Sequence, residues 1–498
     1  MNPVQPPTLY TICFQKTLSI LRTGLWNRYD TNPFSYLPST IVNDLTKFAL
    51  SQPFHERPKI TELWYLITSG RLTELDLIHH DLESDSNMFL KMMSENVCKN
   101  LRSFSIPACL RDADGSLVEI VLRFCTNLEE VHSALQFDLD ILENCHQLRN
   151  LRFHLPMNQI ADNSLRKVML SSHALKTLEA FAVCAGEDSF QSSKFVAKVL
   201  LGFPNLISVG LADSSLPLKL ILKTQRNSFS LHFKLRRCFW GISHDNYLRV
   251  ANTKKLSTYR KGFSKIIKMA VLSCPCTEEL VINVFHEECL QHLCLLKNLT
   301  FLSINFNYCD SDYMPAWFSV LKEIGPQLKH LSVEKSSDIQ LNVICDNCFN
   351  LESLRIRGKA TIAEATSTIP NLPHLRRLLL MCMNEGSLMY MLSRCPLLTE
   401  MFLDCALCLD DDLLCKILKQ NPLSELKVAG IHACKLSRIG FHLLLESAVK
   451  LEKVSFRSVK MDTSDLIHKL NPKIVNYPIF NKLKDIEFFR RKLHPCRF

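Results

Sequence analysis

The sequence predicts an α/β solenoid in which parallel strands form the concave face and helices cover the convex face. Three observations predict it: a short leucine phrase recurs along 498 residues, segments with helical spacing separate the copies, and no linker rich in glycine, serine or proline divides the chain. A compact core rarely grows beyond about 300 residues, whereas stacked repeats contact only their neighbours and escape that limit.

The recurring phrase is a leucine, two variable residues, an apolar residue, one variable residue and another apolar residue. Clear copies begin at Leu328, Leu351, Leu423 and Leu451. The second and third apolar residues are two apart, so on a strand they point to one face while their neighbours point to the other. Each copy therefore predicts one half-buried strand.

The first leucines of the phrase recur mostly at steps of 19 to 32 residues, the period of leucine-rich repeats. The series is Leu72, Leu101, Leu128, Leu148, Leu175, Leu206, Leu280, Leu299, Leu328, Leu351, Leu375, Leu398, Leu423, Leu451 and Leu483. Weak copies at Leu231 and Leu256 would divide the long step between Leu206 and Leu280. We expect a leucine-rich-repeat solenoid over residues 51–498.

Helical segments between the strands have recognisable starts and ends. Asp410, Asp411 and Asp412 precede an apolar stripe that begins at Leu413, so acidic residues lie at a helix start, where the helix dipole favours them. Pro422 then ends that helix. One strand and one helix cannot bury their apolar sides alone, but stacked units share a continuous core.

Cysteines recur at equivalent places of the repeats. The chain has 21 of them, and four stand a few residues before a first leucine: Cys125, Cys145, Cys348 and Cys395. Periodic placement predicts small buried residues in tight turns between helix and strand, with reduced thiols, and not a disulfide framework.

Residues 1–50 lack the repeat, and their first part predicts a helix. Pro6, Pro7 and Thr8 are typical of a helix start with Thr8 as its cap. Leu9, Ile12 and Cys13 then share one narrow apolar face at helical spacing.

A second helix is predicted after a polar loop. Pro38 suits its first turn, and Ile41 and Leu45 lie along one side.

Together these patterns resemble the VHL/SOCS-type box of cullin-RING substrate receptors. The elongin C-binding half has a hydroxyl or small residue, Leu, three residues, Cys, and an aliphatic residue four places later. Thr8, Leu9 and Cys13 match it, whereas the aliphatic Leu18 comes one place late. The cullin-2-type half has the form apolar, Pro, two residues, apolar, three residues, apolar, which residues 37–45 fill. Both halves ahead of leucine-rich repeats resemble the Zyg-type elongin-binding receptors.

The resemblance implies a substrate-recognition subunit of a cullin-RING ubiquitin ligase. Its repeats would bind a target protein, and its box would dock to elongin B/C and cullin-2. The implied contacts are Thr8, Leu9, Ile12 and Cys13 for the adaptor, and Leu37, Pro38, Ile41 and Leu45 for the cullin.

Two other interpretations stay open. The helices could cap the apolar end of the first repeat in a scaffold without ligase function, and Leu9 and Cys13 would then face that repeat. Leu37-Pro38 followed by Leu63-Trp64 and the repeats also resembles an F-box, although the interval to the tryptophan is short.

The middle of the chain carries the strongest charge. From Lys219 to Lys268, thirteen basic residues stand against the single acid Asp245, in a chain of net charge +10. Arg236-Arg237 could hold carboxylates or phosphates of an acidic or phosphorylated protein partner, and a solvated basic face is the other interpretation. No DNA or RNA motif accompanies these residues, so nucleic acid is not the expected ligand.

The concave face offers a second target-binding surface. Outward-facing residues of neighbouring strands stand side by side, and they include Arg355, Arg357 and Arg377, followed by Glu400 and Asp404. This alternation of basic and acidic patches predicts either a peptide-binding surface or cross-strand ion pairs that neutralise each other.

Catalytic, metal and membrane functions find no support in the sequence. Phosphate-loop, Gly-x-Ser-x-Gly and His-Glu-x-x-His motifs are absent, and His79-His80-Asp81 and His286-Glu287-Glu288 predict solvated turns. The Cys-x-x-Cys pairs at 345–348 and 405–408 fall two repeats apart, too far to share zinc. No apolar run approaches the roughly 18 residues of a membrane span, and no signal peptide is evident. We expect a non-enzymatic protein without a cofactor, in the cytoplasm or nucleus.

Overall fold

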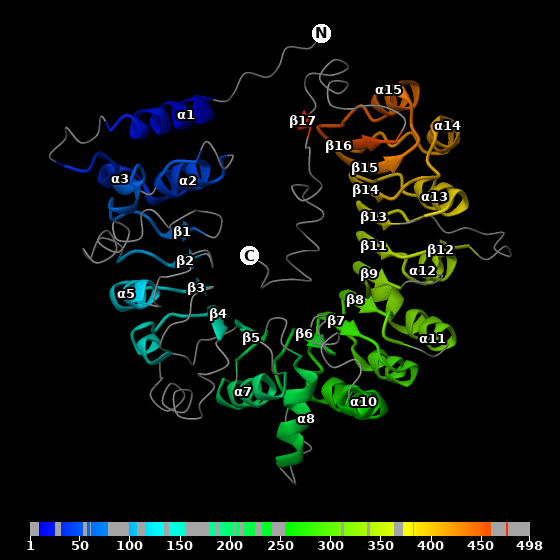
Figure 1. Ribbon diagram of the computed structural model, residues 1–498, viewed down its shortest axis with the longest axis horizontal. Coiled ribbons are helices and arrows are strands. Elements are labelled where there is room, and N and C mark those ends of the chain that lie inside the picture. Colours follow the sequence, from blue (N-terminus) through cyan, green and yellow to red (C-terminus); the bar gives the residue numbers. More distant parts are fainter. Residues whose placement is uncertain are drawn as a thin grey trace. The chain divides into compact units, whose positions relative to one another are not determined.

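The structure, a computed structural model, describes part of the chain in two compact units (Figure 1). The described residues are 9–24, 31–52, 57–59, 61–77, 99–106, 116–133, 139–155, 180–185, 189–203, 205–209, 213–224, 232–241, 254–309, 313–335, 339–362, 372–381, 383–459 and 475–476. The first unit comprises residues 1–212 with 496–498, and the second comprises residues 213–495.

Both helices predicted within residues 1–50 are present in the first unit. α1 spans Leu9–Arg22 and α2 spans Ser39–Leu50, directly after Pro38, whose ring fixes the backbone for a helix start. Between them lies the 3₁₀ helix η2 (Pro33–Tyr36), capped by the Asn32 side chain, which accepts a 3.0 Å bond from the Phe34 amide. A short α3 (Trp64–Ile67) leads into the repeats.

The first unit contains a five-stranded parallel sheet in sequence order. Its strands are β1 (Glu74–Asp76), β2 (Ser103–Ile106), β3 (Glu130–Ser133), β4 (Asn150–Leu155) and β5 (Ala180–Ala185). The helices among and after them are α5 (Ser116–Phe124), η4 (Leu139–Asn144) and α7 (Ser189–Gly202). Because Leu75, Phe104, Val131 and Leu151 are in register, their side chains stack into one buried row.

The second unit contains a ten-stranded parallel sheet in the order β17-β16-β15-β14-β13-β11-β9-β8-β7-β6. The strands are β6 (Arg237–Trp240), β7 (Glu279–Asn283), β8 (Phe301–Asn305), β9 (His330–Glu334), β11 (Ser353–Arg357), β13 (Arg377–Met381), β14 (Glu400–Asp404), β15 (Val428–Cys434), β16 (Lys453–Ser458) and β17 (Val475–Asn476). A separate parallel pair consists of β10 (Ile339–Gln340) and β12 (Ala360–Thr361).

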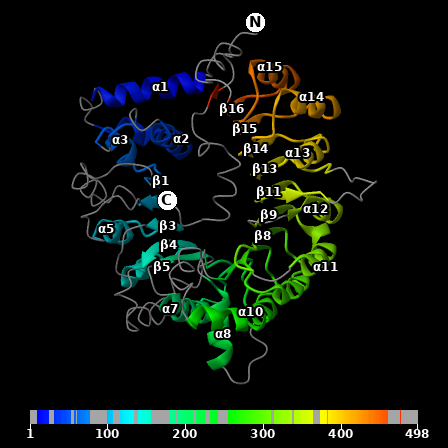
Figure 2. The same ribbon diagram turned by 45° about the vertical axis from the view of Figure 1, so that its right-hand side comes forward.

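Helices cover one face of this second sheet. They are α8 (Ser215–Thr224), α10 (Lys254–Ser273), η7 (Glu287–Leu295), α11 (Met314–Ile324), η8 (Gly325–Gln327), α12 (Leu341–Asn347), α13 (Glu385–Leu392), α14 (Asp411–Gln420) and α15 (Arg438–Ser447). Figures 1 and 2 show α11 to α15 following one another along one side of the strands. We call the opposite side of this sheet the open face.

The recurring leucine pattern marks a half-buried strand, as predicted, in most repeats. Strands begin two residues after the predicted first leucine at Leu72, Leu101, Leu128, Leu148, Leu299, Leu328, Leu351, Leu375, Leu398 and Leu451. All of these leucines are buried, and so are the inward strand residues whose burial the structure describes, for example Leu354 and Ile356 of β11. Strand, turn and helix repeat in this way in both units, so the chain folds as a leucine-rich-repeat solenoid.

The predicted first leucines Leu280 and Leu423 are three residues out of frame. Leu280 lies opposite Leu302, the second apolar place, and the buried Thr277 occupies the first place. Leu423 is likewise wrong, because Val428 lies opposite Glu400 and so makes Leu426 the first leucine. Both Leu423 and Leu426 are buried, which is why an apolar pattern alone could not choose between them.

The poorly matched region between Leu206 and Leu280 differs most from prediction. Leu256 lies in helix α10, so no repeat strand begins there, and β6 begins two residues after Leu235 instead of near Leu231. After Leu206 the backbone forms only a one-residue bridge at Ser208.

Another correction concerns β5, which starts at Ala180, five residues after Leu175, so the register places residue 178 at the first position. Leu175, Leu231 and Leu483 themselves lie outside the described residues.

The cysteine turns are confirmed. Cys125, Cys145, Cys348 and Cys395 are all buried, three residues before a first leucine, and their carbonyls accept bonds from the amides of those leucines at 3.2–3.4 Å. Burial raises the pKa of the Cys145 thiol to about 12, so this thiol stays protonated and acts as a packing group. Leu423 occupies the same place in its own repeat, three residues before Leu426.

Candidate functional site

Helix α1 has two apolar faces, and only one of them is used inside the unit. Phe14, Leu18 and Leu21 are buried. Leu9 is 77% exposed and Ile12 is 45% exposed. The face containing Leu9, Ile12 and the exposed Cys13 is hereafter the α1 ridge. Its direction is opposite to the one that a pure cap predicts for Leu9 and Cys13.

The buried face of α1 is fixed on α2. Phe14 lies 5.8 Å from Phe48 and 4.3 Å from Tyr10, measured between ring centroids. The Tyr10 hydroxyl donates a 2.8 Å hydrogen bond to Asp44, and this bond raises the pKa of the Tyr10 phenol. These contacts place the α1 ridge on the side of the helix away from α2.

Helix α2 is in turn joined to the first repeat. The Asn43 side chain donates to Thr73 Oγ1 at 2.7 Å and accepts from the Thr73 amide at 3.0 Å. Lys47 pairs with Glu74 of β1 at 2.6 Å. The α1 ridge therefore lies on a helix that is coupled, through α2, to the edge strand of the first sheet.

The remaining residues implied by the box are spread between surface and core. Leu37 and Ile41 are half-buried and Pro38 is exposed, so a partner could reach part of this set. Leu45 is only 2% exposed and stabilises α2 from inside. Leu18, the late aliphatic residue of the first half, is also a core residue. Thr8 lies outside the described residues.

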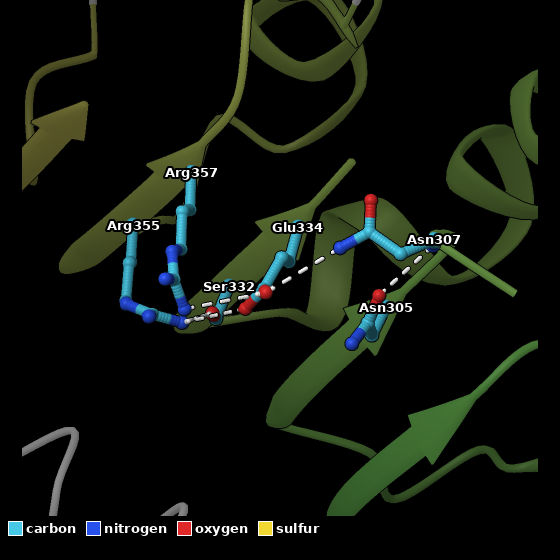
Figure 3. A network of polar contacts seen from close by, with 6 residues as sticks. All are labelled: Asn305, Asn307, Ser332, Glu334, Arg355 and Arg357. Atoms are coloured by element: carbon cyan, nitrogen blue, oxygen red, sulfur yellow. Dashed lines mark hydrogen bonds and ion pairs between the residues drawn. The ribbon is translucent and has the colours of Figure 1, made fainter. Parts of the chain in front are cut away.

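The predicted arginine surface exists on the open face of the second unit (Figure 3). Glu334 of β9 receives both arginines of β11: Arg357 at 3.3 Å and Arg355 at 3.9 Å. Arg355 also donates a 3.0 Å bond to Ser332. One carboxylate thus neutralises half of the charge of two guanidinium groups.

Asparagines extend this network across the next strand. The Asn307 side chain donates to Glu334 at 3.4 Å, and the Asn307 backbone N–H donates to the side-chain oxygen of Asn305 of β8 at 2.9 Å (Figure 3). Sequence reasoning missed both asparagines because their role depends on the register between β8 and β9, which a single strand pattern does not contain.

Arg377 takes part in a separate ion pair, with Glu400 of β14 at 3.4 Å. Beside it lies an apolar cluster of Leu379, Phe402 and Val428 on β13, β14 and β15, in which Leu379 lies opposite Phe402 and Val428 lies opposite Glu400. Phe402 has no water-accessible surface. Cross-strand ion pairs, one of the two predicted outcomes, are therefore present, and they flank an apolar centre.

The basic segment at 219–268 separates into two surfaces. Arg236 and Arg237 pair with Glu278 and Glu279 at 3.6 and 3.1 Å, so each of these arginines has its own acid. A lysine cluster lies elsewhere, on helices α8 and α10, where burial and the charges of Lys223 and Lys265 lower the pKa of the Lys219 ammonium. Because each arginine has its own carboxylate, the two adjacent side chains do not form one joint binding site for an anion.

Reactive-looking groups outside these surfaces have structural roles. His286 caps η7 by accepting a 3.4 Å bond from the Glu288 amide, so the predicted turn at 286–288 is the start of a 3₁₀ helix, whereas residues 79–81 lie outside the described ranges. Within the described ranges, no group of three metal-ligating side chains comes together and no helix is long and apolar enough to cross a membrane.

Comparison with known proteins finds similarity in solved structures alone. No protein-family model and no curated protein matches this chain. Its sequence is 14% identical to the matched part of the yeast Rad7 and Elc1 complex structure, which covers 58% of this chain and 92% of that one with a TM-score of 0.24.

Two bacterial structures are similar at the same level. The leucine-rich-repeat protein LegL7 of Legionella pneumophila is 14% identical, with coverage of 53% of this chain and 83% of that one and a TM-score of 0.32. A Bacteroides fragilis protein is 13% identical, with coverage of 52% and 83% and a TM-score of 0.23.

Proposed function

We propose that this chain is a substrate-recognition subunit of a cullin-RING ubiquitin ligase. The α1 ridge would bind elongin C of an elongin B/C adaptor, and the loop and start of α2 would meet cullin-2. The observation that carries the proposal is the double-sided α1: Phe14, Leu18 and Leu21 already hold the helix in place, so Leu9, Ile12 and Cys13 are left for a partner.

The chemistry of the α1 ridge suits helix-in-groove recognition. A leucine that is 77% exposed gains free energy only when a partner covers it, and a small cysteine one turn later lets the two surfaces approach closely. The cullin surface reduces to Leu37, Pro38 and Ile41, because the buried Leu45 cannot be reached without unfolding α2.

The repeats would hold the target. The ligase reaction needs a target lysine near the ubiquitin-bearing enzyme, and a receptor supplies that proximity without chemistry of its own. We therefore propose a non-enzymatic role, in the cytoplasm or nucleus, where the exposed thiols of Cys13, Cys276 and Cys405 would stay reduced.

Target contacts are proposed for the exposed arginines of the open face. Arg357 keeps 53% of its side chain exposed beside Glu334, whereas Arg355 keeps only 16%. Arg377, Arg236 and Arg237 would have to exchange their present acids for those of an acidic target. A target that brings its own carboxylates or phosphates could compete for these arginines.

Co-purification with elongin B, elongin C and cullin-2 tests the proposal. We expect the wild-type chain to retain all three, and Leu9→Ser/Cys13→Phe to weaken adaptor binding about 30-fold or more, because a central anchor is lost. Gln15→Ala, also exposed on α1 but polar, is the matched control and should bind normally. Circular dichroism checks that both variants fold.

Each alternative interpretation of the N-terminal helices predicts a different outcome. If the double variant binds as well as the wild type, the α1 ridge is not the adaptor site. If neither chain binds and the double variant unfolds more easily, the helices are a cap on a leucine-rich-repeat scaffold without a ligase. The two bonds between Asn43 of α2 and Thr73 support this second candidate, because they attach α2 to the first repeat.

A further inference from the structure

A pocket of about 470 Å³ lies at the N-terminal ends of the central strands β9, β11 and β13, where three successive turns enter the second sheet. This edge pocket is separate from the arginines of the open face. Its polar lining is formed by Gln327, Lys329, Asn350, Glu352, His374 and Arg376. The size falls within the range of small-ligand sites, about 300–1,000 Å³.

Two amides keep the walls of the edge pocket in place. The Asn350 side chain donates a 2.7 Å bond to the Pro326 carbonyl. The Gln327 side chain donates a 2.7 Å bond to the Leu296 carbonyl. These donors tie each turn to the turn before it, so the charged side chains between them project from a fixed frame.

Positive charge exceeds negative charge in the edge pocket. Lys329 lies 3.4 Å from Glu352, so these two neutralise each other. Arg376 and His374 are exposed, and neither the guanidinium nor the imidazole makes an ion pair or a hydrogen bond with any residue that the structure describes. The guanidinium and the imidazole are therefore available to a ligand.

An anion with several oxygens fits this set of donors best. A guanidinium binds two oxygens of one phosphate at once, and the ammonium of Lys329 can leave Glu352 for a ligand of higher charge. A carboxylate offers only two oxygens and one negative charge, whereas a phosphoryl group offers three oxygens and about two negative charges.

We propose that the edge pocket binds a phosphoryl group, and that its source is a phosphorylated side chain of the protein target. The peptide source rests on the proposed function as a substrate receptor; the phosphoryl chemistry rests on the pocket alone. Arg376 is the main contact, Lys329 and His374 assist, and Glu352 is a built-in competitor that restricts the pocket to strongly charged ligands.

The residue pattern supplies a matched control. Lys427 occupies the same place before β15 that Arg376 occupies before β13, and both amides donate to a carbonyl of the preceding repeat at 2.9 Å. Lys427 is exposed, carries the same charge and does not line the edge pocket. Removing it therefore changes the total charge equally but leaves the edge pocket intact.

The test measures fluorescence anisotropy of the full chain with a labelled pentapeptide, Gly-Ala-phosphoserine-Ala-Gly, beside its serine twin. Arg376→Ala should weaken phosphopeptide binding about tenfold or more, because a charge-assisted bidentate contact is lost. Glu352→Gln should strengthen it severalfold, and Lys427→Ala should leave it within about twofold. Unlabelled inorganic phosphate is added as a competitor.

Opposite changes from Arg376→Ala and Glu352→Gln, with the serine twin unbound, would support the proposal. Equal losses from Arg376→Ala and Lys427→Ala would overturn it, because only general charge would then matter. If inorganic phosphate competes at the same concentration as the phosphopeptide, a small phosphate compound is the ligand and the peptide source is overturned. Adaptor binding by the α1 ridge, measured on the same preparations, shows separately whether the proposed function holds.

Discussion

At the residue scale, Asn421 shows how one buried amide can join two repeats. Its nitrogen donates to the carbonyls of Leu392 at 2.7 Å and Cys395 at 3.1 Å, and its oxygen accepts from the Leu423 amide at 3.2 Å. The buried side chain thus satisfies three backbone groups. The sequence predicted only that residues 421 and 422 end a helix.

Asn421→Ala should lower the free energy of unfolding by roughly 2–3 kcal/mol, because buried backbone groups lose their partners. Chemical denaturation measures the change. Asn350→Ala removes a single bond at an exposed turn and should cost less than about 1 kcal/mol. Equal costs for the two variants would contradict the role assigned to Asn421.

His432 makes stability depend on pH. Burial lowers the pKa of its imidazole from the ordinary 6.5; Asp404 opposes this effect and Arg457 adds to it. Below that pH the unfolded chain binds a proton that the folded chain resists, so the free energy of unfolding falls until the folded imidazole titrates as well.

In the His432→Gln variant, the free energy of unfolding should therefore fall less steeply as the pH is lowered from about 7 to 5. Urea denaturation at several pH values measures it. The loss of the 2.7 Å contact between His432 and Ser455 lowers stability at every pH, so the slope rather than the absolute value is the test. Parallel curves for the wild type and the variant would disprove the assignment.

At the element scale, the three aspartates at the start of α14 have different structural roles. Asp410 caps the helix by accepting a 2.9 Å bond from the Leu413 amide. Asp411 reaches the next repeat, where it accepts bonds from the amide and the hydroxyl of Ser437, the cap of α15. The sequence predicted acids at a helix start but could not reveal that one of them holds the following helix.

Asp411→Ala should cost roughly 2–3 kcal/mol of unfolding free energy, since the amide and hydroxyl of the half-buried Ser437 lose a charged acceptor. Asp412→Ala removes the same charge from the same turn, is exposed, and should cost less than about 0.5 kcal/mol. Thermal denaturation of both variants gives the comparison. A larger loss from Asp412→Ala would mean that helix-dipole charge matters more than the bond to Ser437.

Elements were predictable where local pattern and register coincide. The strand after Leu351 and the turn at Cys348 follow from spacing alone, because each repeat must bury the same few positions. Thr277 breaks that reasoning: its hydroxyl bonds the Cys274 carbonyl at 2.8 Å, so a polar residue fills a leucine position and the phrase is displaced by three.

At the scale of the whole molecule, we predict that the two compact units unfold in two separate events. Stability in repeat proteins is passed between neighbours, and the five strands of the first unit and the ten strands of the second each pair within their own unit. Phe104→Ala removes a fully buried ring from β2 and should destabilise the first unit by about 3–5 kcal/mol.

Hydrogen exchange followed by mass spectrometry would locate the effect of Phe104→Ala. We expect faster exchange in β1–β5 and unchanged exchange in β7–β16. The matched substitution Leu354→Ala in β11 should give the reverse. Faster exchange in both sheets after either substitution would show that the chain unfolds as one cooperative body instead.

The candidate site was predictable only in part, for a reason of scale. Helical spacing identified Leu9, Ile12 and Cys13 as one face, because that depends on neighbouring residues. It could not show that Phe14 and Leu18 carry the packing, nor that Glu334 serves two arginines, because both facts require distant elements to meet.

The exposed apolar face of α1 also has a consequence for the free chain, before it binds any partner. A newly made copy displays Leu9, Tyr10 and Ile12 to the cell, each at least 45% exposed. Chaperones and quality-control enzymes recognise such exposed apolar surfaces on subunits that lack their partner. The abundance of this protein should therefore follow the supply of whatever covers the α1 ridge, and recombinant yields should rise when that partner is produced alongside it.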